Sequence, residues 1–172
     1  AYDHKSVKAS LISTPLTYMG FSGYLNPFTN EAQVNDLIPK TNFATTTCHE
    51  MAHQIGYASE SEANFIGYMA SIYNDDIYFN YSGYTYALRY CLHNIEMKEE
   101  GKTKELLPLI RPGVLENFKD SDAFWDSHQN IMEPLFKVFY DNFLKLNQQK
   151  DGMESYSKFV DLLVNYYEKR AL

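Results

Sequence analysis

The feature that most constrains this chain is a His-Glu-x-x-His motif, formed by His49, Glu50 and His53 within a stretch of helical pattern. On a helix, residues four positions apart share a face, so the two imidazoles project in the same direction. Two imidazoles placed in this way can bind one zinc ion at about 2.0–2.1 Å each. The carboxylate between them flanks the metal, where it can hold and deprotonate a water molecule. The motif therefore predicts a zinc site with Glu50 as the general base.

The residues after the motif predict a second helix that starts close to the first. Gly56 suits the position just after a helix end, because glycine adopts positive φ without strain. Ser59 and Glu62 then fit a capping box, in which the serine caps the new helix and the glutamate lies at its third position. A catalytic zinc usually has three protein ligands and leaves a fourth position for water. We expect the second helix to provide the third ligand.

Glu60 and Glu62 are the two candidates for that third ligand. They lie two positions apart, about 200° around a helix, so they cannot both face the metal. Glu62 has a competing role in the capping box, whereas Glu60 shares a face with Asn64, whose amide can orient a histidine ligand from behind. In the other direction, Glu62 lies nearer the apolar face of its helix. The pattern favours Glu60 as the ligand, with Glu62 as the alternative.

The whole chain, residues 1–172, is predicted to form a single α+β domain that is mainly helical. Before the motif, β-branched and apolar residues bounded by proline and glycine indicate a small sheet, and after it apolar residues recur at helical spacing. The expected strands are 7–14, 18–25 and 32–37. The expected helices are about 45–56, 59–73, 83–99, 120–146 and 155–169, with short helices over 103–119 that break at Pro108 and Pro112.

Three of these helices are expected to turn a defined apolar face inward, because their apolar residues recur every three to four positions. The first is Phe65, Ile66, Met69, Ala70 and Tyr73, the second is Tyr84, Leu88, Cys91, Leu92 and Ile95, and the third is Phe159, Leu162, Leu163 and Tyr166.

Composition narrows the classes of function. The chain has 172 residues, of which 45% are hydrophobic, enough to bury one core. Its formal net charge of −7 argues against nucleic acid or an anionic membrane surface as the main partner, because both require basic patches. Its two cysteines allow at most one disulfide. No long apolar run is present, so we expect no transmembrane helix in this chain.

The segment Glu60-Ser61-Glu62-Ala63-Asn64 resembles the Glu-x-x-Ala-Asp element that follows His-Glu-x-x-His in gluzincin metallopeptidases of the prenyl-protein-protease and heat-shock-protease types. In those families the first glutamate is the third zinc ligand, so the resemblance implies this role for Glu60. Two differences are visible. Only six residues separate His53 from Glu60, and Asn64 stands where the families have aspartate.

Over nearly its whole length, the chain is similar to an uncharacterised bacterial family of membrane-anchored proteins proposed to be zinc peptidases. The matching phrases are Asn26-Pro27-Phe28-Thr29-Asn30-Glu31-Ala32, residues 49–64, and Gly152-Met153-Glu154-Ser155-Tyr156. The resemblance implies that this chain is the soluble C-terminal domain of a protein whose membrane anchor lies outside it. It also favours Tyr156 as the group that stabilises the oxyanion. Tyr84 and His93, which the resemblance does not single out, are the other candidates.

Taken together, these observations predict a zincin-like metallopeptidase that hydrolyses a peptide or protein substrate with zinc as its cofactor. A strand within 18–37 is expected to accept an extended peptide by edge addition. Two alternatives stay open at this point: a zinc-binding envelope sensor module without turnover, and a zinc amidase that acts on cell-wall peptide. The sequence defines neither the substrate nor the oligomeric state.

Overall fold

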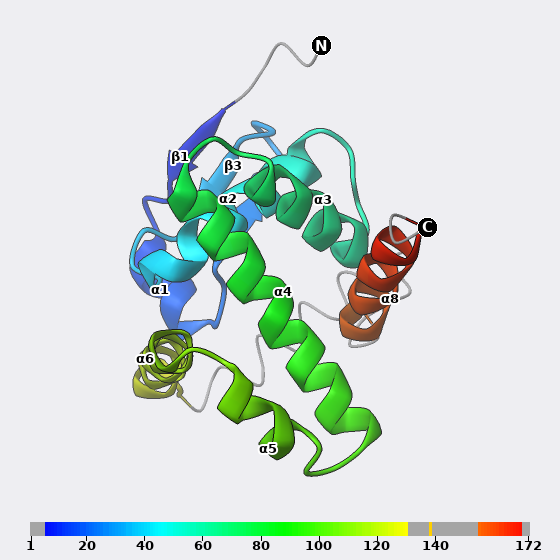
Figure 1. The fold of residues 1–172 in the computed structure, drawn as a ribbon. Helices are drawn as coiled ribbons and strands as arrows, with labels where there is room; N and C mark the ends of the chain where they lie inside the picture. Colours follow the sequence, from blue (N-terminus) through cyan, green and yellow to red (C-terminus); the bar gives the residue numbers. More distant parts are fainter. Residues whose placement is uncertain (1–5, 131–137, 139–154, 170–172) are drawn as a thin grey trace.

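The computed structural model describes residues 6–130, 138 and 155–169. Its elements in chain order are β1 Val7–Ala9, α1 Ser13–Tyr18, β2 Gly23–Leu25, β3 Ala32–Val34, α2 Lys40–Gln54, α3 Glu60–Ile72, α4 Ile77–Lys98, α5 Thr103–Leu106, the 3₁₀ helix η1 Leu107–Leu109, α6 Pro112–His128 and α8 Ser155–Glu168. The fold is α+β and mainly helical, as predicted (Figure 1). None of the helices in the described ranges is long and apolar enough to cross a membrane.

The small sheet has the strand order β1-β3-β2, with β3 parallel to β1 and antiparallel to β2. The residues of β3 are buried, from Ala32 to Val34. Helix α2 contacts β2 and β3 as well as α3 and α4. The helix that carries the His-Glu-x-x-His motif therefore lies between the sheet and the other helices (Figure 1).

Helices α2 and α3 approach each other closely at a glycine. A Cβ atom added to Gly67 of α3 would lie 2.9 Å from the His49 amide nitrogen and 3.0 Å from its Cα. The neighbouring buried positions on α3 are also small, namely Ala63 and Ser71. Because side chains of this size leave the backbones in near contact, α3 is held directly against the histidine-bearing part of α2.

An aromatic core fills the space where α3, α4 and α8 meet. Its buried members are Tyr68, Ala87, Phe159 and Leu163, and Phe159 is completely buried. Figure 1 shows α8 lying beside α3 and α4, in agreement with their contacts. The predicted inward face of the last helix is therefore confirmed at Phe159 and Leu163, while Leu162 and Tyr166 are partly buried.

The expected strands are longer than the observed ones. Instead of a strand over 7–14, β1 ends at Ala9 and the helix α1 follows, with Pro15 inside its first turn. Proline is tolerated there because the first amides of a helix have no partner within the helix. The second and third strands, expected over 18–25 and 32–37, are confined to Gly23–Leu25 and Ala32–Val34.

Several helix starts also differ from the prediction. Helix α2 begins at Lys40, directly after Pro39, and α4 begins at Ile77, where the Asp76 carboxylate accepts a hydrogen bond from the Tyr78 amide at 2.8 Å. Pro112 does not break a helix but starts α6, because proline suits the first helical position. The helix expected over 120–146 is thus the second half of α6, which ends at His128, and residues 131–137 and 139–146 lie outside the described part.

The inward face predicted for α3 is only partly correct. Tyr73 is 60% exposed and Ala70 is also exposed, whereas Ala63, Gly67 and Tyr68 are buried. The prediction followed the larger apolar residues, but close packing against α2 selects the small ones. On α4, Tyr84 is likewise exposed rather than buried.

Gly67→Ala should lower the free energy of unfolding by about 1–3 kcal/mol, since overpacking of a close helix contact typically costs this much. The better helix propensity of alanine offsets about 1 kcal/mol at most. Chemical denaturation measures the difference. Gly113→Ala is the matched control, because a Cβ atom at Gly113 of α6 would meet nothing within 4 Å, and this variant should be unchanged or slightly more stable. Equal stability of the two variants would contradict the close approach of α2 and α3.

Candidate metal centre

Three potential metal ligands converge where α2 ends and α3 begins. The Nε2 atoms of His49 and His53 lie 3.0 Å apart. Of the two Glu60 carboxylate oxygens, Oε2 lies 3.3 Å from Nε2 of His49, and Oε1 lies 3.6 Å from Nε2 of His53. Among the residues that the structure describes, these three form a group whose ligand atoms all lie within 4.8 Å of one another. The structure thus brings together the three residues predicted as ligands.

The spacing of these atoms fits a tetrahedral metal site. With metal–ligand bonds of about 2.0–2.1 Å, two ligands of tetrahedral zinc lie about 3.3–3.4 Å apart. The three observed separations of 3.0, 3.3 and 3.6 Å scatter around that value. Two imidazoles and one carboxylate are a donor set found in catalytic zinc sites, which keep one position open. His49, His53 and Glu60 therefore fit a zinc ion with small movements of their side chains.

A tight turn after α2 places Glu60 opposite the histidines. Gly56 has φ of +109°, and its amide donates to the His53 carbonyl at 3.0 Å. The Tyr57 amide then donates to the Ala52 carbonyl at 3.1 Å, which closes the end of the helix. Such positive φ is readily adopted only by glycine, so the predicted helix stop at Gly56 is confirmed.

The start of α3 differs from the predicted capping box. Ser59 occupies the N-cap position with extended backbone, but its side chain makes no capping hydrogen bond. Instead its hydroxyl group contacts that of Ser61 at 2.9 Å. The Glu62 side chain is exposed, whereas Glu60, the first residue of α3, faces the histidines. Of the two candidate glutamates, the geometry therefore places Glu60 in the site.

A backbone carbonyl fixes the orientation of one imidazole. Nδ1 of His53 lies 2.7 Å from the Tyr57 carbonyl oxygen, which can only accept, so Nδ1 carries the proton. The lone pair of His53 is consequently on Nε2, the atom that faces His49 and Glu60. A carbonyl behind a histidine ligand is a common arrangement in metal sites. This contact could not be predicted from residue types, because the backbone carbonyl of any residue could supply it.

Asn64 does not perform the role predicted for it. Its Oδ1 accepts a hydrogen bond from the Tyr86 hydroxyl at 2.6 Å, and that hydroxyl in turn contacts Tyr90 at 3.0 Å. Nδ1 of His49 is buried and has no hydrogen-bond partner among the described residues. Asn64 therefore connects α3 to α4 through Tyr86 and does not orient a histidine in this structure.

The charges of the three residues reinforce one another. Burial by itself would raise the pKa of Glu60, but hydrogen bonds and positive charge from His49 and His53 outweigh it and hold this pKa well below its ordinary value. Burial likewise lowers the pKa of His53, but its interaction with Glu60 prevails and raises this pKa above the ordinary value. The space between the three side chains thus favours a positive charge, whether a proton or a metal ion.

Glu50, the predicted general base, is buried between α2 and the sheet. It is 5% exposed, and a Cβ atom added to Gly23 of β2 would lie 2.7 Å from its Oε1 atom. Burial raises the pKa of Glu50, and repulsion from Glu60 acts in the same direction, while His49 and His53 oppose both. A carboxyl group whose pKa is raised towards neutrality is better suited to take up and return a proton.

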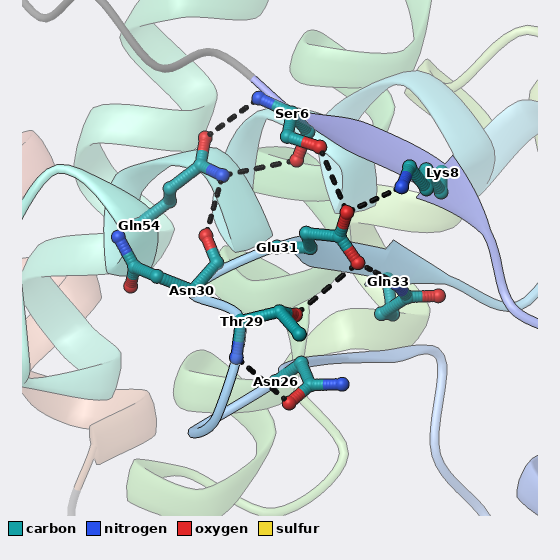
Figure 2. Close-up of polar contacts among 8 residues, drawn as sticks. All are labelled: Ser6, Lys8, Asn26, Thr29, Asn30, Glu31, Gln33 and Gln54. Atoms are coloured by element: carbon teal, nitrogen blue, oxygen red, sulfur yellow. Dashed lines mark hydrogen bonds and ion pairs between the residues drawn. The ribbon is translucent and has the colours of Figure 1, made fainter.

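Gln54, which the sequence analysis did not single out, fixes the end of α2 to the N-terminal strands. Its Nε2 donates to the carbonyl oxygens of Ser6 at 3.0 Å and Asn30 at 2.7 Å, and its Oε1 accepts from the Ser6 amide at 3.5 Å (Figure 2). Gln54 directly follows His53 and is buried. Its three contacts therefore hold the histidine-bearing turn against β1 and the β2–β3 turn.

Two of the three candidate oxyanion stabilisers, Tyr84 and His93, make contacts with residues other than the three ligands. Tyr84 is 54% exposed and packs edge-on against the Tyr68 ring. His93 lines a cavity along α4. The side chain of Tyr156 lies outside the described part of the structure. The role of Tyr156 stays a prediction from resemblance.

Comparison with known proteins gives a family without an assigned function. A family model described as "Protein of unknown function (DUF3810)" matches residues 1–164 of this chain. No curated protein and no solved structure matches. The matched range includes the whole sheet, the hairpin of α2 and α3, and most of α8.

Metal-free protein should bind one zinc ion per chain. Loss of a residue that only hydrogen-bonds to a metal ligand typically lowers metal affinity by roughly 10–100-fold. His49→Ala and Glu60→Gln should each lower the zinc affinity by more than this. The physical reason is that each variant removes a direct metal–ligand bond. Competition with a chromogenic chelator measures the affinity. Glu62→Gln, the matched control, should keep the parent affinity. Weak binding by Glu62→Gln together with parent affinity of Glu60→Gln would contradict the site.

Proposed function

The chain belongs to the DUF3810 family of proteins of unknown function, and we propose that it is a zinc-dependent peptidase. The observation that carries the proposal is a buried carboxylate next to a set of three convergent metal ligands. Glu50 directly follows His49, and the ligand atoms of His49, His53 and Glu60 lie within 4.8 Å of one another. A structural metal site is usually closed by four protein ligands, whereas a hydrolytic site has three ligands and a base beside them.

When bound, zinc would supply a Lewis acid that polarises the scissile carbonyl and lowers the pKa of water towards 7. His49, His53 and Glu60 would hold the ion, and the Tyr57 carbonyl would keep the His53 lone pair on Nε2. Glu50 would accept a proton from the attacking water on its carboxylate and pass it to the nitrogen of the departing amine. Because burial raises the pKa of Glu50, its carboxyl group is able to serve in both directions.

The position of β2 supports a peptide as the substrate. β2 is an outer strand of the three-stranded sheet, and its Gly23 packs on the Glu50 side chain. An extended peptide that adds to an outer strand forms backbone hydrogen bonds along it. A substrate paired with β2 would therefore pass Glu50, which is consistent with the predicted edge addition.

Glu50 also separates this proposal from the alternative of a zinc-binding sensor module. Burial disfavours the ionised form of Glu50, so this side chain lowers the stability of the folded protein when it is charged. A module that needs only the metal gains nothing from this side chain. A buried carboxylate with a raised pKa beside a set of potential metal ligands is typical of a catalytic site.

Anchoring of the full-length protein in a membrane is also a proposal, and it rests on the resemblance given above. The anchor would lie outside this chain, whose described helices include none that could span a membrane.

Glu50→Gln should keep zinc and lower kcat by about 10²–10⁴-fold, the usual contribution of a general acid–base group. The amide has nearly the same shape but cannot take up a proton. Mass spectrometry of a mixed peptide library incubated with zinc-loaded protein gives the cleavage rates. Full metal-dependent proteolysis by this variant would overturn the assignment, and a zinc-loaded parent that cleaves no peptide would favour the sensor module or the amidase.

Gly23→Ala should lower kcat by about 10–100-fold, because displacement of a catalytic group by about 1 Å can cost this much. The added methyl group would lie 2.7 Å from the Glu50 carboxylate, so that either the base or β2 must move. Zinc affinity should stay at the parent value, as measured by chelator competition. Gly113→Ala on α6 serves as the control for a glycine substitution that meets no neighbour. Parent activity of Gly23→Ala would show that Glu50 is not positioned by β2.

A further inference from the structure

A cavity of about 820 Å³ is lined by residues of α2, α4, α6 and α8 together with Ser22. Two of its lining residues connect it to the general base. Ser22 precedes Gly23, the residue packed on Glu50, and Thr46 lies one helical turn before Glu50 on α2. A volume of this size is typical of pockets that enclose a ligand of several residues or a drug-sized molecule. The cavity is thus placed to receive one side of a substrate held at the base.

The wall of this cavity is aromatic and cationic. Phe118 and Trp125 of α6 line it together with Arg89 and Lys98 of α4. None of the lining residues within the described ranges is acidic, although the chain has 22 acidic and 15 basic residues. A pocket that carries only positive charge in an acidic protein is complementary to an anionic ligand.

Arg89 is oriented so that part of its guanidinium group can bind a ligand. It lies over the Phe118 ring at 5.5 Å from the centroid, and its Nη2 atom pairs with the Asp122 carboxylate. Asp122 is 55% exposed and does not line the cavity. Nε and Nη1 of Arg89 form no hydrogen bond with any residue in the described ranges. A guanidinium fixed in this way can still donate a charge-assisted hydrogen bond to an anion from Nε or from Nη1.

We propose that this cavity binds the part of the peptide substrate on one side of the scissile bond, and that Arg89 selects a carboxylate there. The proposal rests on the peptidase function proposed above and names its substrate class. Arg89 follows Tyr86 by three residues, about 4.5 Å along α4, and the Tyr86 hydroxyl contacts Asn64 of α3. Tyr86 thus links the cavity that Arg89 lines to the helix that carries Glu60.

Matched peptides test the selection and separate the two sources of a carboxylate. One series places Glu or Gln at each position around a cleaved bond, and a second compares a free with an amidated C-terminus. The parent enzyme should prefer a carboxylate by at least about 10-fold in kcat/KM, equivalent to one lost charge-assisted contact. Arg89→Gln should reduce the ratio of kcat/KM between the carboxylate peptide and its neutral counterpart to about 1. A preference that survives Arg89→Gln, or no preference in the parent, would overturn the proposal.

Asp122→Asn is the matched variant, because it breaks the same ion pair but keeps the cation. If Arg89 binds the substrate carboxylate, loss of the Asp122 carboxylate that competes for it should increase the preference for Glu over Gln peptides. If the pair only supports the contact between α4 and α6, both variants should lose stability alike and neither should change selectivity. An equal fall in preference for the two variants would therefore contradict the role of Arg89.

Trp125 provides a readout that does not depend on zinc or turnover. It is the single tryptophan of the chain and lines the cavity, so its fluorescence should change when metal-free protein binds a peptide. The Glu peptide should bind at least about 10-fold more tightly than the Gln peptide, and Arg89→Gln should abolish this difference. Such binding, together with no cleavage by the zinc-loaded protein, would refute the peptidase but support the anion-binding pocket. Cleavage without carboxylate-dependent binding would refute the pocket alone.

Discussion

The near contact of α2 and α3 at Gly67 is the constraint on which the rest of the site depends. Glycine at this position lets the backbone of α3 lie against that of His49, and Gly56 supplies the turn that brings the chain back. Glu60 reaches the two histidines only because both conditions hold. The gap of six residues between His53 and Glu60 is therefore sufficient, although the gluzincin families that the motif resembles use a longer connection.

The same packing concentrates charge in a small volume. Glu60 and His53 shift each other's pKa towards the charged forms, whereas burial pushes the pKa of Glu50 in the opposite direction. One carboxylate is thus prepared to hold a cation and the other to exchange a proton. This division between two nearby carboxylates is what a hydrolytic metal site requires, and it follows from where each lies: Glu60 in contact with the imidazoles, Glu50 enclosed by β2.

The parts of the site that could be predicted were side chains that stand at characteristic spacings in the sequence. His49, Glu50 and His53 follow from helical geometry, and Gly56 and Glu60 from the turn chemistry and from resemblance. The Tyr57 carbonyl and the contacts of Gln54 were not predictable, because they depend on how distant segments pack together rather than on local sequence pattern.

The buried face of α3 differs from the prediction for a related reason. Hydrophobic periodicity gives most weight to large residues such as Tyr73, but close helix packing buries small ones. The strand expected over 7–14 and the helix break expected at Pro112 fail for one reason: Pro15 and Pro112 both lie in the first turn of a helix, where proline is allowed.

Zinc K-edge X-ray absorption of the metal-loaded protein tests the central claim most directly, because it reports the atoms bound to the ion. The structure predicts two imidazole ligands together with oxygen ligands, all at about 2.0–2.2 Å, and no sulfur. Cys48 precedes His49 but is buried as a free thiol, so it serves as an internal alternative. A sulfur shell at about 2.3 Å, or scattering from a single imidazole, would contradict a site formed by His49, His53 and Glu60.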